Sequence, residues 1–464
     1  MTDMETEEAE HLPLRARCAV WLCNTLRRAL HLVGRGGTNL PGKLALKLDP
    51  ALPARLAKGL RIIAVSGTNG KTTTCRMLSA ALERSGVPVL TNRSGANLRT
   101  GVTALLAENI RRGRAVKRVA VIECDEAAWR TLAAQLKPEI LVVTNVFRDQ
   151  LDRYGEVLHT LSELAEGAAA TPETVLCLNA DDSLVADLAR RCPNPCRWYG
   201  MDVPAPAAQE ETRSDAMYCI RCGEKYRYDY TTYAHLGGFV CPGCGYRRSA
   251  AGVAVTGIDA MEREESRVLL RIGAEEAPQR VPLPAVYNIY NLLAAAAGLT
   301  AFGLAPEAIR AGLDTEAGFG RMERFALGRG VTMILVKNPA GFMQVLDYLA
   351  SFTEEFDLLC CLNDKAQDGR DISWIWDVPL ERLAAGGIPV KEVYAAGTRG
   401  EEMRLRLRHA GIGGDMLRLV RRYPAFLRGL SARKRPLVIV PTYTAMMALR
   451  PKLAKMTGAK AFWE

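Results

Sequence analysis

The segment at residues 61–74, RIIAVSGTNGKTTT, constrains the fold of this chain more than any other stretch. An apolar, β-branched run leads into a glycine-rich turn, and Lys71, Thr72 and Thr73 then open a predicted helix. In such a strand–loop–helix unit the backbone N–H groups of the loop point at phosphate oxygens. The lysine can reach the β- and γ-phosphates, and the Thr72 hydroxyl suits a Mg²⁺ ion. The segment therefore predicts an α/β protein that binds a nucleoside triphosphate.

The loop supplies most of the expected nucleotide contacts. They are Gly67, Thr68, Asn69, Gly70, Lys71, Thr72 and Thr73.

Further apolar strands follow the loop and alternate with helix-like stretches. This rhythm predicts a mostly parallel sheet with helices on both faces, and a second α/β pattern begins near Arg324. The predicted strands are 118–124, 140–146 and 174–178, and then 332–336, 356–362, 390–396 and 436–440. Ligands of such sheets gather at the carboxyl ends of the strands, where Gly67, Glu123 and Asn145 fall.

The size and charge of the chain bound its architecture. With 464 residues it is too long for one core, so we expect two or three domains. The net charge of +10 favours an anionic partner such as a nucleotide, a diphosphate substrate or an acidic membrane face, and a merely basic surface explains it equally well. No window has the roughly 18 apolar residues of a membrane span, because Arg27 and Arg28 interrupt the best candidate.

Glu123 ends a predicted buried strand beside the phosphate loop. A carboxylate there would complete the Mg²⁺ ligands, although Asp125 and Glu126 lie close to it in the sequence. Asn288 and Asn291 are three residues apart on one face of a predicted helix. Their carboxamides can read the edge of adenine, or one of them can be a helix cap.

Two Cys-x-x-Cys pairs, separated by 18 residues, have the spacing of a four-thiolate zinc ribbon. The predicted Zn²⁺ ligands are Cys219, Cys222, Cys241 and Cys244. Four protein ligands leave no open position for a substrate, so we expect a structural role or a contact surface, and not catalysis. A nucleic-acid reader is the alternative, but the tyrosines between the pairs, with few lysines, favour a small packed core, and we expect no nucleic acid partner.

These motifs together resemble the Mur ligase family, which uses the short loop GTNGKT where a general Walker loop has a glycine at the position of Val65. The motifs that carry the resemblance are GTNGKTTT, TN with DQLD, LNADD, the Asn-x-x-Asn helix, GRMERF at 320–325 and KNPAGF at 337–342. The zinc ribbon, GRGGTNLPGKLALKL at 34–48, DGRDISWIWD at 368–377 and PTYTAM at 441–446 are similar to one subgroup, the MurT ligase subunits of lipid II isoglutaminyl synthase.

The resemblance implies a fold and a set of domains. It implies a Mur ligase-like central ATPase domain at residues 51–323 that carries the zinc ribbon at 217–248, after an N-terminal segment at 1–50. A C-terminal α/β domain specific to the MurT subgroup would cover 324–464. It also implies a cytoplasmic protein that uses ATP, Mg²⁺ and structural Zn²⁺, and it leaves association with the inner face of the membrane open.

The implied reaction is amidation. ATP would phosphorylate the α-carboxylate of D-glutamate in the peptide stem of lipid II, and ammonia would attack the acyl phosphate to give D-isoglutamine. Arg321 and Lys337 would contact phosphate at the domain junction, and Asn97 would lie near the metal. Glu323 would orient Arg321 or be a solvated acid.

Two departures argue against the alternatives, an amino-acid-adding Mur ligase and a folylpolyglutamate synthase-like ligase. Many amino-acid-adding enzymes carry a modified lysine near the metal, but no lysine lies between Lys137 and Lys225 here. The KNP motif also follows Ile-Leu-Val, where those enzymes have a DYAH motif. Both departures suit a small nucleophile such as ammonia.

The resemblance supplies the source of ammonia. No cysteine lies in a G-x-C-x-G elbow, so the chain lacks the nucleophile of a glutaminase. A separate GatD-type glutaminase subunit would form a heterodimer with the chain, and an Asp of this chain would complete its Cys–His pair. Asp368 is the first candidate and Asp371 the second, ahead of Asp364 and Asp377.

Overall fold

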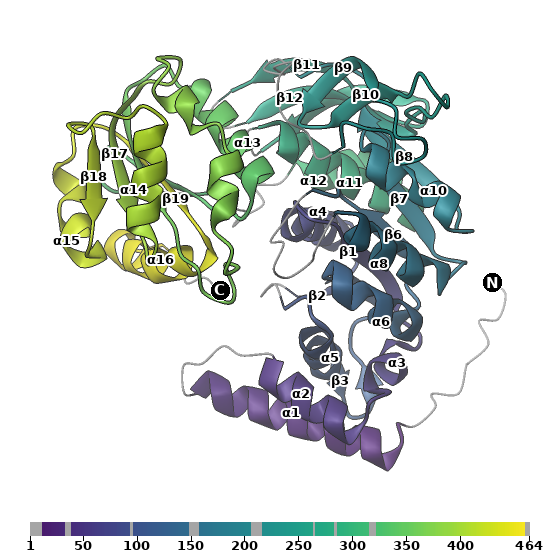
Figure 1. Cartoon of the computed structure of the whole chain (residues 1–464). Coiled ribbons are helices and arrows are strands. Elements are labelled where there is room, and N and C mark those ends of the chain that lie inside the picture. The colour runs from purple at the N-terminus through teal and green to yellow at the C-terminus, as the bar shows by residue number, and fades with distance from the viewer. Residues whose placement is uncertain are drawn as a thin grey trace.

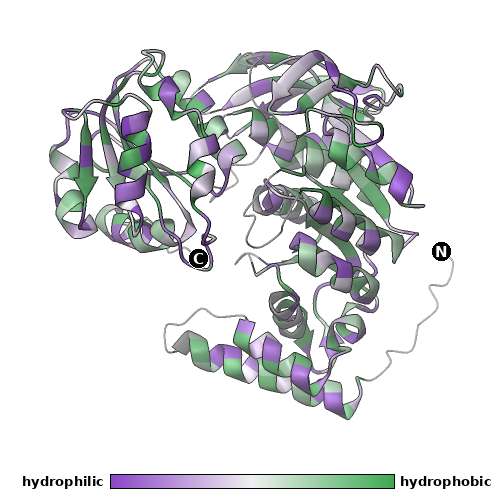
Figure 2. Ribbon diagram, viewed as in Figure 1, coloured by the Kyte–Doolittle hydropathy of each residue, from purple (hydrophilic) through white to green (hydrophobic). Residues whose placement is uncertain are grey.

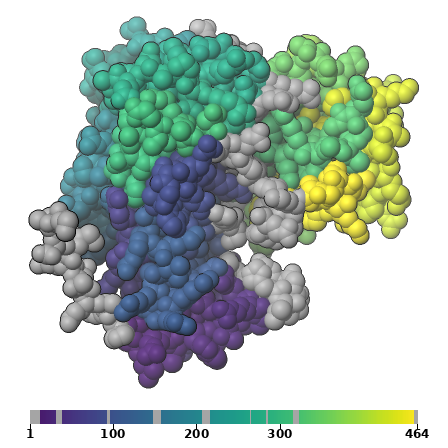
Figure 3. Space-filling model, turned by 180° about the vertical axis from the view of Figure 1, so that it is seen from behind, coloured from purple at the N-terminus to yellow at the C-terminus, as the bar shows by residue number. Residues whose placement is uncertain are grey.

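The computed structural model describes residues 12–32, 39–92, 96–147, 157–205, 216–262, 265–282, 285–314 and 322–459. In this structure the N-terminal helices, a central α/β domain and a C-terminal α/β domain follow one another around an arc (Figure 1). Seen from behind, the purple N-terminal helices and the yellow C-terminal helix lie at separate ends of the molecule (Figure 3).

The central domain is built on a nine-stranded sheet in the order β13-β12-β11-β8-β7-β6-β1-β5-β2. The strands from β2 to β11 in this order are parallel, and β12 and β13 are added antiparallel. Their bounds are β1 Arg61–Ser66, β2 Val89–Thr91, β5 Val119–Glu123, β6 Ile140–Val143, β7 Val175–Asn179, β8 Cys196–Met201, β11 Val253–Met261, β12 Ser266–Ile272 and β13 Glu275–Val281. The predicted parallel sheet is confirmed.

Helices cover both faces of this sheet, as the alternation of buried residues along β1 requires. Ile63 and Val65 belong to one apolar core, and Ile62 and Ala64 belong to the core on the other face. The first face packs against α4 Lys71–Arg84, α11 Val286–Phe302 and α12 Pro306–Leu313. The second face packs against α3 Leu52–Ala57, α5 Arg99–Glu108, α6 Glu126–Leu136 and α8 Val157–Ala169, with the short helices α9 Ser183–Ala186 and α10 Leu188–Arg191 nearby.

Two N-terminal helices, α1 Leu14–Leu32 and α2 Asn39–Leu48, extend this second layer beyond α5. Gly42 lies so close to α5 that a Cβ there would be 1.8 Å from the Thr100 carbonyl oxygen, so this position accepts only glycine. Asn24 donates to the Ala107 carbonyl oxygen over 2.9 Å, and Arg27 pairs with Glu108. In the part of the chain that the structure describes, no helix is long and apolar enough to span a bilayer.

Two β-hairpins lie outside the main sheet of the central domain. The small one joins β3 Ile110–Arg111 to β4 Arg114–Ala115, and the larger one joins β9 Arg227–Tyr233 to β10 Leu236–Val240 within the predicted ribbon. Tyr226, Phe239 and Tyr246 form the apolar core of the ribbon, with ring centroids 5.2 to 6.3 Å apart. Tyr233, which the sequence placed in the same small core, packs into the main core of the central domain instead.

The C-terminal domain has a six-stranded sheet in the order β14-β15-β19-β16-β17-β18, in which only the β14–β15 pair is antiparallel. The strands are β14 Met322–Phe325, β15 Val331–Ile334, β16 Phe356–Cys361, β17 Val390–Ala396, β18 Leu417–Val420 and β19 Leu437–Pro441. The helices are α13 Pro339–Ala350, α14 Gly400–His409, α15 Tyr423–Arg428 and α16 Tyr443–Thr457, with 3-10 turns η1 Ser373–Asp377, η2 Leu380–Leu383 and η3 Leu430–Ala432. The predicted boundary between residues 323 and 324 falls inside β14.

Glu323 fastens the first strand of this domain to its last helix. Its two carboxylate oxygens each accept a hydrogen bond from Arg450, both over 2.9 Å. The Arg450 side chain is only 2% exposed, so the loss of a paired carboxylate there would be costly. Glu323 is therefore not a solvated acid, and Arg321, which it was expected to orient, lies outside the described residues.

Replacement of Glu323 by Gln should destabilise the C-terminal domain. The change removes the carboxylate charge that both Arg450 hydrogen bonds to Glu323 use, and we expect a loss of about 3 kcal/mol. Thermal unfolding of the ligand-free protein measures it. Glu401→Gln, which removes an exposed partner of Arg404, is the matched control and should change stability by less than about 0.5 kcal/mol. Equal melting of the two variants would contradict the role given to the pair.

Candidate active site

The phosphate loop connects β1 to α4 and has two glycines in the left-handed region of φ. Gly67 has φ +116° and Gly70, which precedes the first residue of α4, has φ +87°. A Cβ on Gly67 would lie 2.4 Å from Thr144 Oγ1 and 2.8 Å from the Asn145 carbonyl oxygen. Glycine is thus required at both positions, as the sequence predicts.

Asn145, at the end of β6, holds the loop in place. Its carbonyl oxygen accepts from Thr68 N over 2.8 Å, and its Oδ1 accepts from Asn69 N over 2.9 Å. Its Nδ2 donates to the Asn69 carbonyl oxygen over 3.1 Å. The sequence predicted only that Asn145 lies at the edge of the sheet. The structure shows that it also holds the phosphate loop through three hydrogen bonds.

Lys71 is buried at the start of α4. Its Nζ donates to Glu126 Oε1 over 2.9 Å and to the Gly67 carbonyl oxygen. Burial lowers the pKa of Lys71, but the nearby carboxylates of Glu126, Asp125 and Glu123 outweigh this effect, so its pKa is raised and it stays charged. Burial also raises the pKa of Glu126, against the opposing effect of Lys71.

Glu123 lies at the end of β5 and collects the groups expected around a metal. Thr72 Oγ1 donates to Glu123 Oε2 over 2.8 Å, and Asn97 Nδ2 donates to Glu123 Oε1 over 3.1 Å. A buried carboxylate, a hydroxyl and a carboxamide beside a phosphate loop are oxygen donors of the kind that Mg²⁺ uses with phosphate oxygens. The residues present fit this ion.

The two acids that follow Glu123 have other tasks. Asp125 caps α6 by accepting from Ala127 N over 3.2 Å, and Glu126 pairs with Lys71. Of the three neighbouring carboxylates, Glu123 is the one that accepts a hydrogen bond from the Thr72 hydroxyl among the described contacts.

A pocket that is open to solvent adjoins the loop between the two α/β domains. Asn291 Oδ1 faces Gly70, and Asn291 Nδ2 donates to Asn288 Oδ1 over 3.1 Å. Asn288 is therefore fixed by Asn291, and of this predicted pair only Asn291 lines the pocket. The residues that line it are Asn69, Gly70, Thr73, Asn145, Tyr233, Tyr287 and Asn291 from the central domain and Ile334, Leu335, Ala340, Gly341, Gln344 and Val345 from the C-terminal domain.

Asn338 of the KNP motif bridges the domains. Its Nδ2 donates to Asn69 Oδ1 over 3.2 Å, and its Oδ1 caps α13 by accepting from Gly341 N over 2.9 Å. Sequence reasoning named only the preceding Lys337, which is half-buried at the same junction. A cap residue before Pro339 was the signal that could have identified Asn338. Arg321 and the two acids of the DQLD motif, Asp149 and Asp152, lie outside the described residues.

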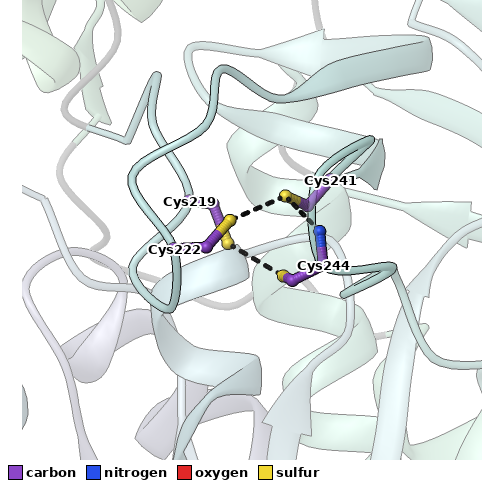
Figure 4. A group of neighbouring side chains, drawn as sticks. All are labelled: Cys219, Cys222, Cys241 and Cys244. Atoms are coloured by element: carbon purple, nitrogen blue, oxygen red, sulfur yellow. Dashed lines mark hydrogen bonds between the residues drawn. The ribbon is translucent and has the colours of Figure 1, made fainter.

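The four predicted zinc ligands come together in the ribbon (Figure 4). All four Sγ atoms lie within 4.8 Å of one another, with 3.6 Å between Cys219 and Cys244 and 3.3 Å between Cys222 and Cys241. Tetrahedral Zn–S bonds of about 2.3 Å place sulfur atoms about 3.8 Å apart, so the cluster fits Zn²⁺. The four cysteines flank the open end of the β9–β10 hairpin, and Tyr233, at the other end of this hairpin, lines the pocket beside the phosphate loop.

Asp368 and Asp371 lie after β16, at the carboxyl edge of the second sheet. Asp368 is buried and accepts from Thr444 N over 2.7 Å at the start of α16, and also from Thr444 Oγ1. The carboxylate thus lies at the N-terminal end of α16, where the partial positive charge of the helix dipole is located. Asp371 is half-exposed and accepts from Ser373 N over 2.8 Å.

Comparison with known proteins places these sites in a family. Residues 65–225 match the Mur ligase middle domain, and residues 335–446 match the MurT ligase C-terminal domain. The chain is 35% identical to the MurT subunit of lipid II isoglutaminyl synthase (glutamine-hydrolyzing) of Streptococcus pneumoniae, over 92% of this chain and 94% of that protein. It is 32% identical to the same subunit of Staphylococcus aureus, over 95% of this chain and 98% of that protein.

Solved structures show the same fold. A crystal structure of MurF from Acinetobacter baumannii has a TM-score of 0.64 at 19% identity and covers 89% of this chain and 80% of its own. Mycobacterium tuberculosis folylpolyglutamate synthase has a TM-score of 0.61 at 15% identity and covers 94% of this chain and 98% of its own. The predicted Mur ligase fold is confirmed.

We expect the purified protein to carry about one zinc ion per chain, because four thiolates within tetrahedral reach bind Zn²⁺ tightly. Elemental analysis should find this zinc lost in Cys219→Ser/Cys222→Ser, with a lower melting temperature. The control is Cys18→Ser/Cys196→Ser, which removes two thiols outside the cluster and should keep the metal. Full stability of a metal-free preparation would refute the zinc site.

Proposed function

The chain belongs to the MurT family of lipid II isoglutaminyl synthase subunits, and from this premise we propose that it amidates lipid II. The reaction is the ATP-dependent conversion of the α-carboxylate of D-glutamate in the peptide stem to D-isoglutamine. The observation that carries the proposal is the joint position of Lys71, Thr72 and Glu123 at the sheet edge, beside a pocket that both domains line. The enzyme is an ATP-dependent carbon–nitrogen ligase of peptidoglycan synthesis.

The reaction has two steps. A carboxylate oxygen of the substrate attacks the γ-phosphorus of ATP, the bond from that phosphorus to the bridging oxygen breaks, and ADP leaves. Ammonia then attacks the carbonyl carbon of the acyl phosphate, loses a proton and expels inorganic phosphate. The chain's task is to position the groups and to neutralise charge on the transferred phosphoryl group.

The loop residues divide this task. The N–H groups of residues 67–73 would cradle the phosphates, and Lys71 would exchange Glu126 for a phosphate oxygen. Thr72, Glu123 and Asn97 would hold Mg²⁺, which supplies charge neutralisation when bound. Arg321 and Lys337 would add positive charge from the domain junction.

Adenine would occupy the pocket between the domains. Asn291 offers a carboxamide to the base edge, Asn288 orients it, and Tyr233 and Tyr287 supply apolar rings. Because Asn338 contacts the phosphate loop through Asn69, nucleotide binding and domain closure would be coupled. Closure protects a hydrolysable acyl phosphate from water.

The second candidate, ligation of an amino acid as in other Mur ligases or in folylpolyglutamate synthase, has no specific observation in its favour. The solved structures of those enzymes share the fold at 15 to 19% identity, which does not extend to their substrates.

A separate glutaminase of the GatD type would supply the ammonia. Cys360 and Cys361 lie in β16 and are buried. Burial raises the pKa of Cys361 to about 12. Neither side chain is therefore a reactive thiolate. We assign to Asp368 the role of orienting the partner's histidine. Its carboxylate is held by Thr444, while Lys365, Ala366 and Gln367 of the same loop are exposed for docking.

The substrate also sets the location. Lipid II is anchored in a bilayer, so the enzyme would work in the cytoplasm at the inner face of the membrane.

Lys71→Ala should lower ATP-dependent amidation by roughly three orders of magnitude, since it removes a charge that acts on the transferred phosphoryl group. Product formation from lipid II, ATP and ammonium measures it. The melting temperature should stay close to that of the wild type, and Lys455→Ala, on the exposed face of α16, should keep full activity. Normal turnover by a folded Lys71→Ala protein would exclude this site.

The ligase alone should use ammonium but not glutamine, and addition of the glutaminase should restore glutamine use. Asp368→Asn should then reduce glutamine-dependent turnover at least roughly a hundredfold and leave ammonium-dependent turnover close to normal, because the acid serves the partner's histidine. Equal loss in both assays would assign Asp368 to the ligase site or to folding. The same selective loss in Asp371→Asn alone would move the role to Asp371.

A further inference from the structure

The outer surface of the N-terminal helices is basic and free of acids. Residues 12–48 contain seven Lys and Arg side chains and no Asp or Glu. Arg17, Arg28, Lys43 and Lys47 are exposed, and none of them makes an ion pair among the described residues. Unpaired charges of one sign over two neighbouring helices form a surface that attracts anions.

Exposed apolar side chains share this surface. Trp21 is 68% exposed and Leu14 is 75% exposed. With Cys18, Thr25 and Arg28 they form one stripe of α1, opposite the buried Ala16, Ala19 and Cys23. On α2, Leu40, Lys43 and Lys47 share the exposed face in the same way. The two N-terminal helices carry both hydrophilic and hydrophobic residues along their length (Figure 2).

The β3–β4 hairpin extends the surface. It follows directly on the end of α5, which contacts α1 through Glu108 and Arg27. Arg111, Arg112 and Arg114 are exposed on the hairpin, and Val116 behind it is 55% exposed. We call the faces of α1, α2 and this hairpin the N-terminal face. Of the eleven large apolar side chains exposed in the described part of the chain, five lie on it: Leu14, Trp21, Leu40, Leu48 and Val116.

We propose that the N-terminal face docks on an anionic lipid bilayer. Arginine and lysine around an exposed tryptophan and leucines match the composition of an interfacial surface, with apolar side chains entering the headgroup region and cations binding lipid phosphates. Helices that carry both kinds of side chain bind bilayers without spanning them, and no described helix can span one. A nucleic acid would use the charges but leave the leucines exposed.

The position of this face suits a lipid-linked substrate. Helix α5 begins two residues after Asn97, which contacts Glu123, and ends against α1. Its ten residues span about 15 Å. The proposed docking face and the reaction centre are thus joined by one short helix, so a substrate headgroup that projects from the bilayer could reach the loop. This step rests on the proposed function, but lipid binding itself does not.

The test is co-sedimentation of the full chain, with its acidic first ten residues, with vesicles at physiological salt. We expect binding to phosphatidylcholine vesicles that contain 30% phosphatidylglycerol, and little binding to phosphatidylcholine alone. Trp21→Ser/Leu14→Ser and Lys43→Glu/Lys47→Glu should each weaken binding by at least roughly tenfold. Trp376→Ser and Lys452→Glu/Lys455→Glu change the same residue types at exposed positions of the C-terminal domain and should bind as the wild type does.

A spectroscopic readout locates the contact. Brominated lipids should quench the tryptophan fluorescence of the wild type and of Trp376→Phe, and Trp21→Phe should remove most of this quenching. No binding to the anionic vesicles, equal loss in the N-terminal and control variants, or quenching that persists in Trp21→Phe would each overturn the proposal.

Activity separates this proposal from the function on which it rests. The Lys43→Glu/Lys47→Glu protein should amidate a short-chain, water-soluble substrate at the wild-type rate and lose turnover only on substrate embedded in vesicles. Absence of amidation by the wild type on both substrates, with normal vesicle binding, would refute the function and leave the docking face standing.

Discussion

The hydrogen bonds from Asn145 to Thr68 and Asn69 hold the phosphate loop of the active site in place. Three hydrogen bonds fix the backbone of the phosphate loop to the end of a neighbouring parallel strand. The loop is then pressed so closely against Thr144 and Asn145 that only glycine fits at position 67. The same hydrogen bonds orient Asn69. The contact from Asn69 to Asn338 of the C-terminal domain therefore depends on Asn145 as well. Asn145 therefore fixes the geometry of the phosphate loop and, through Asn69, supports the position of the C-terminal domain against it.

The electrostatics of the site follow from where β5 ends and α6 begins. Three carboxylates within four residues leave the strand in different directions, so each meets a different partner: Thr72, the first turn of α6, and Lys71. Glu126 pairs with the buried Lys71 over 2.9 Å and neutralises its charge. A phosphate that binds at the loop must compete with the Glu126 carboxylate for Lys71. An anion that cannot also accept from the loop N–H groups would therefore bind more weakly.

The zinc ribbon contributes to the pocket between the two α/β domains. Tyr233 at the end of β9 packs against Phe147 and Tyr290, with ring centroids 5.6 Å apart in both cases, and lines the pocket. Asp181 of the LNADD motif accepts from Arg248, after the second cysteine pair, and from Tyr290 of α11. Burial raises the pKa of Asp181, and Arg248 opposes this effect. A metal that orders the ribbon thus also supports the helix that carries Asn291.

The sequence by itself determined the local chemistry: the phosphate loop, the four thiolates, and the strands whose apolar, β-branched runs are buried on both faces. These features depend on the spacing of residues that are close together in the chain, and the local backbone geometry of a loop, knuckle or strand places such residues directly. Only the tertiary structure decided which of three adjacent acids meets Thr72 and that Asn145 and Asn338 hold the loop. It also decided that Glu323 pairs with Arg450 and that α1 and α2 pack against α5. Each of these joins residues far apart in the chain or depends on the direction of a side chain, and both are set by how strands and helices pack rather than by local sequence.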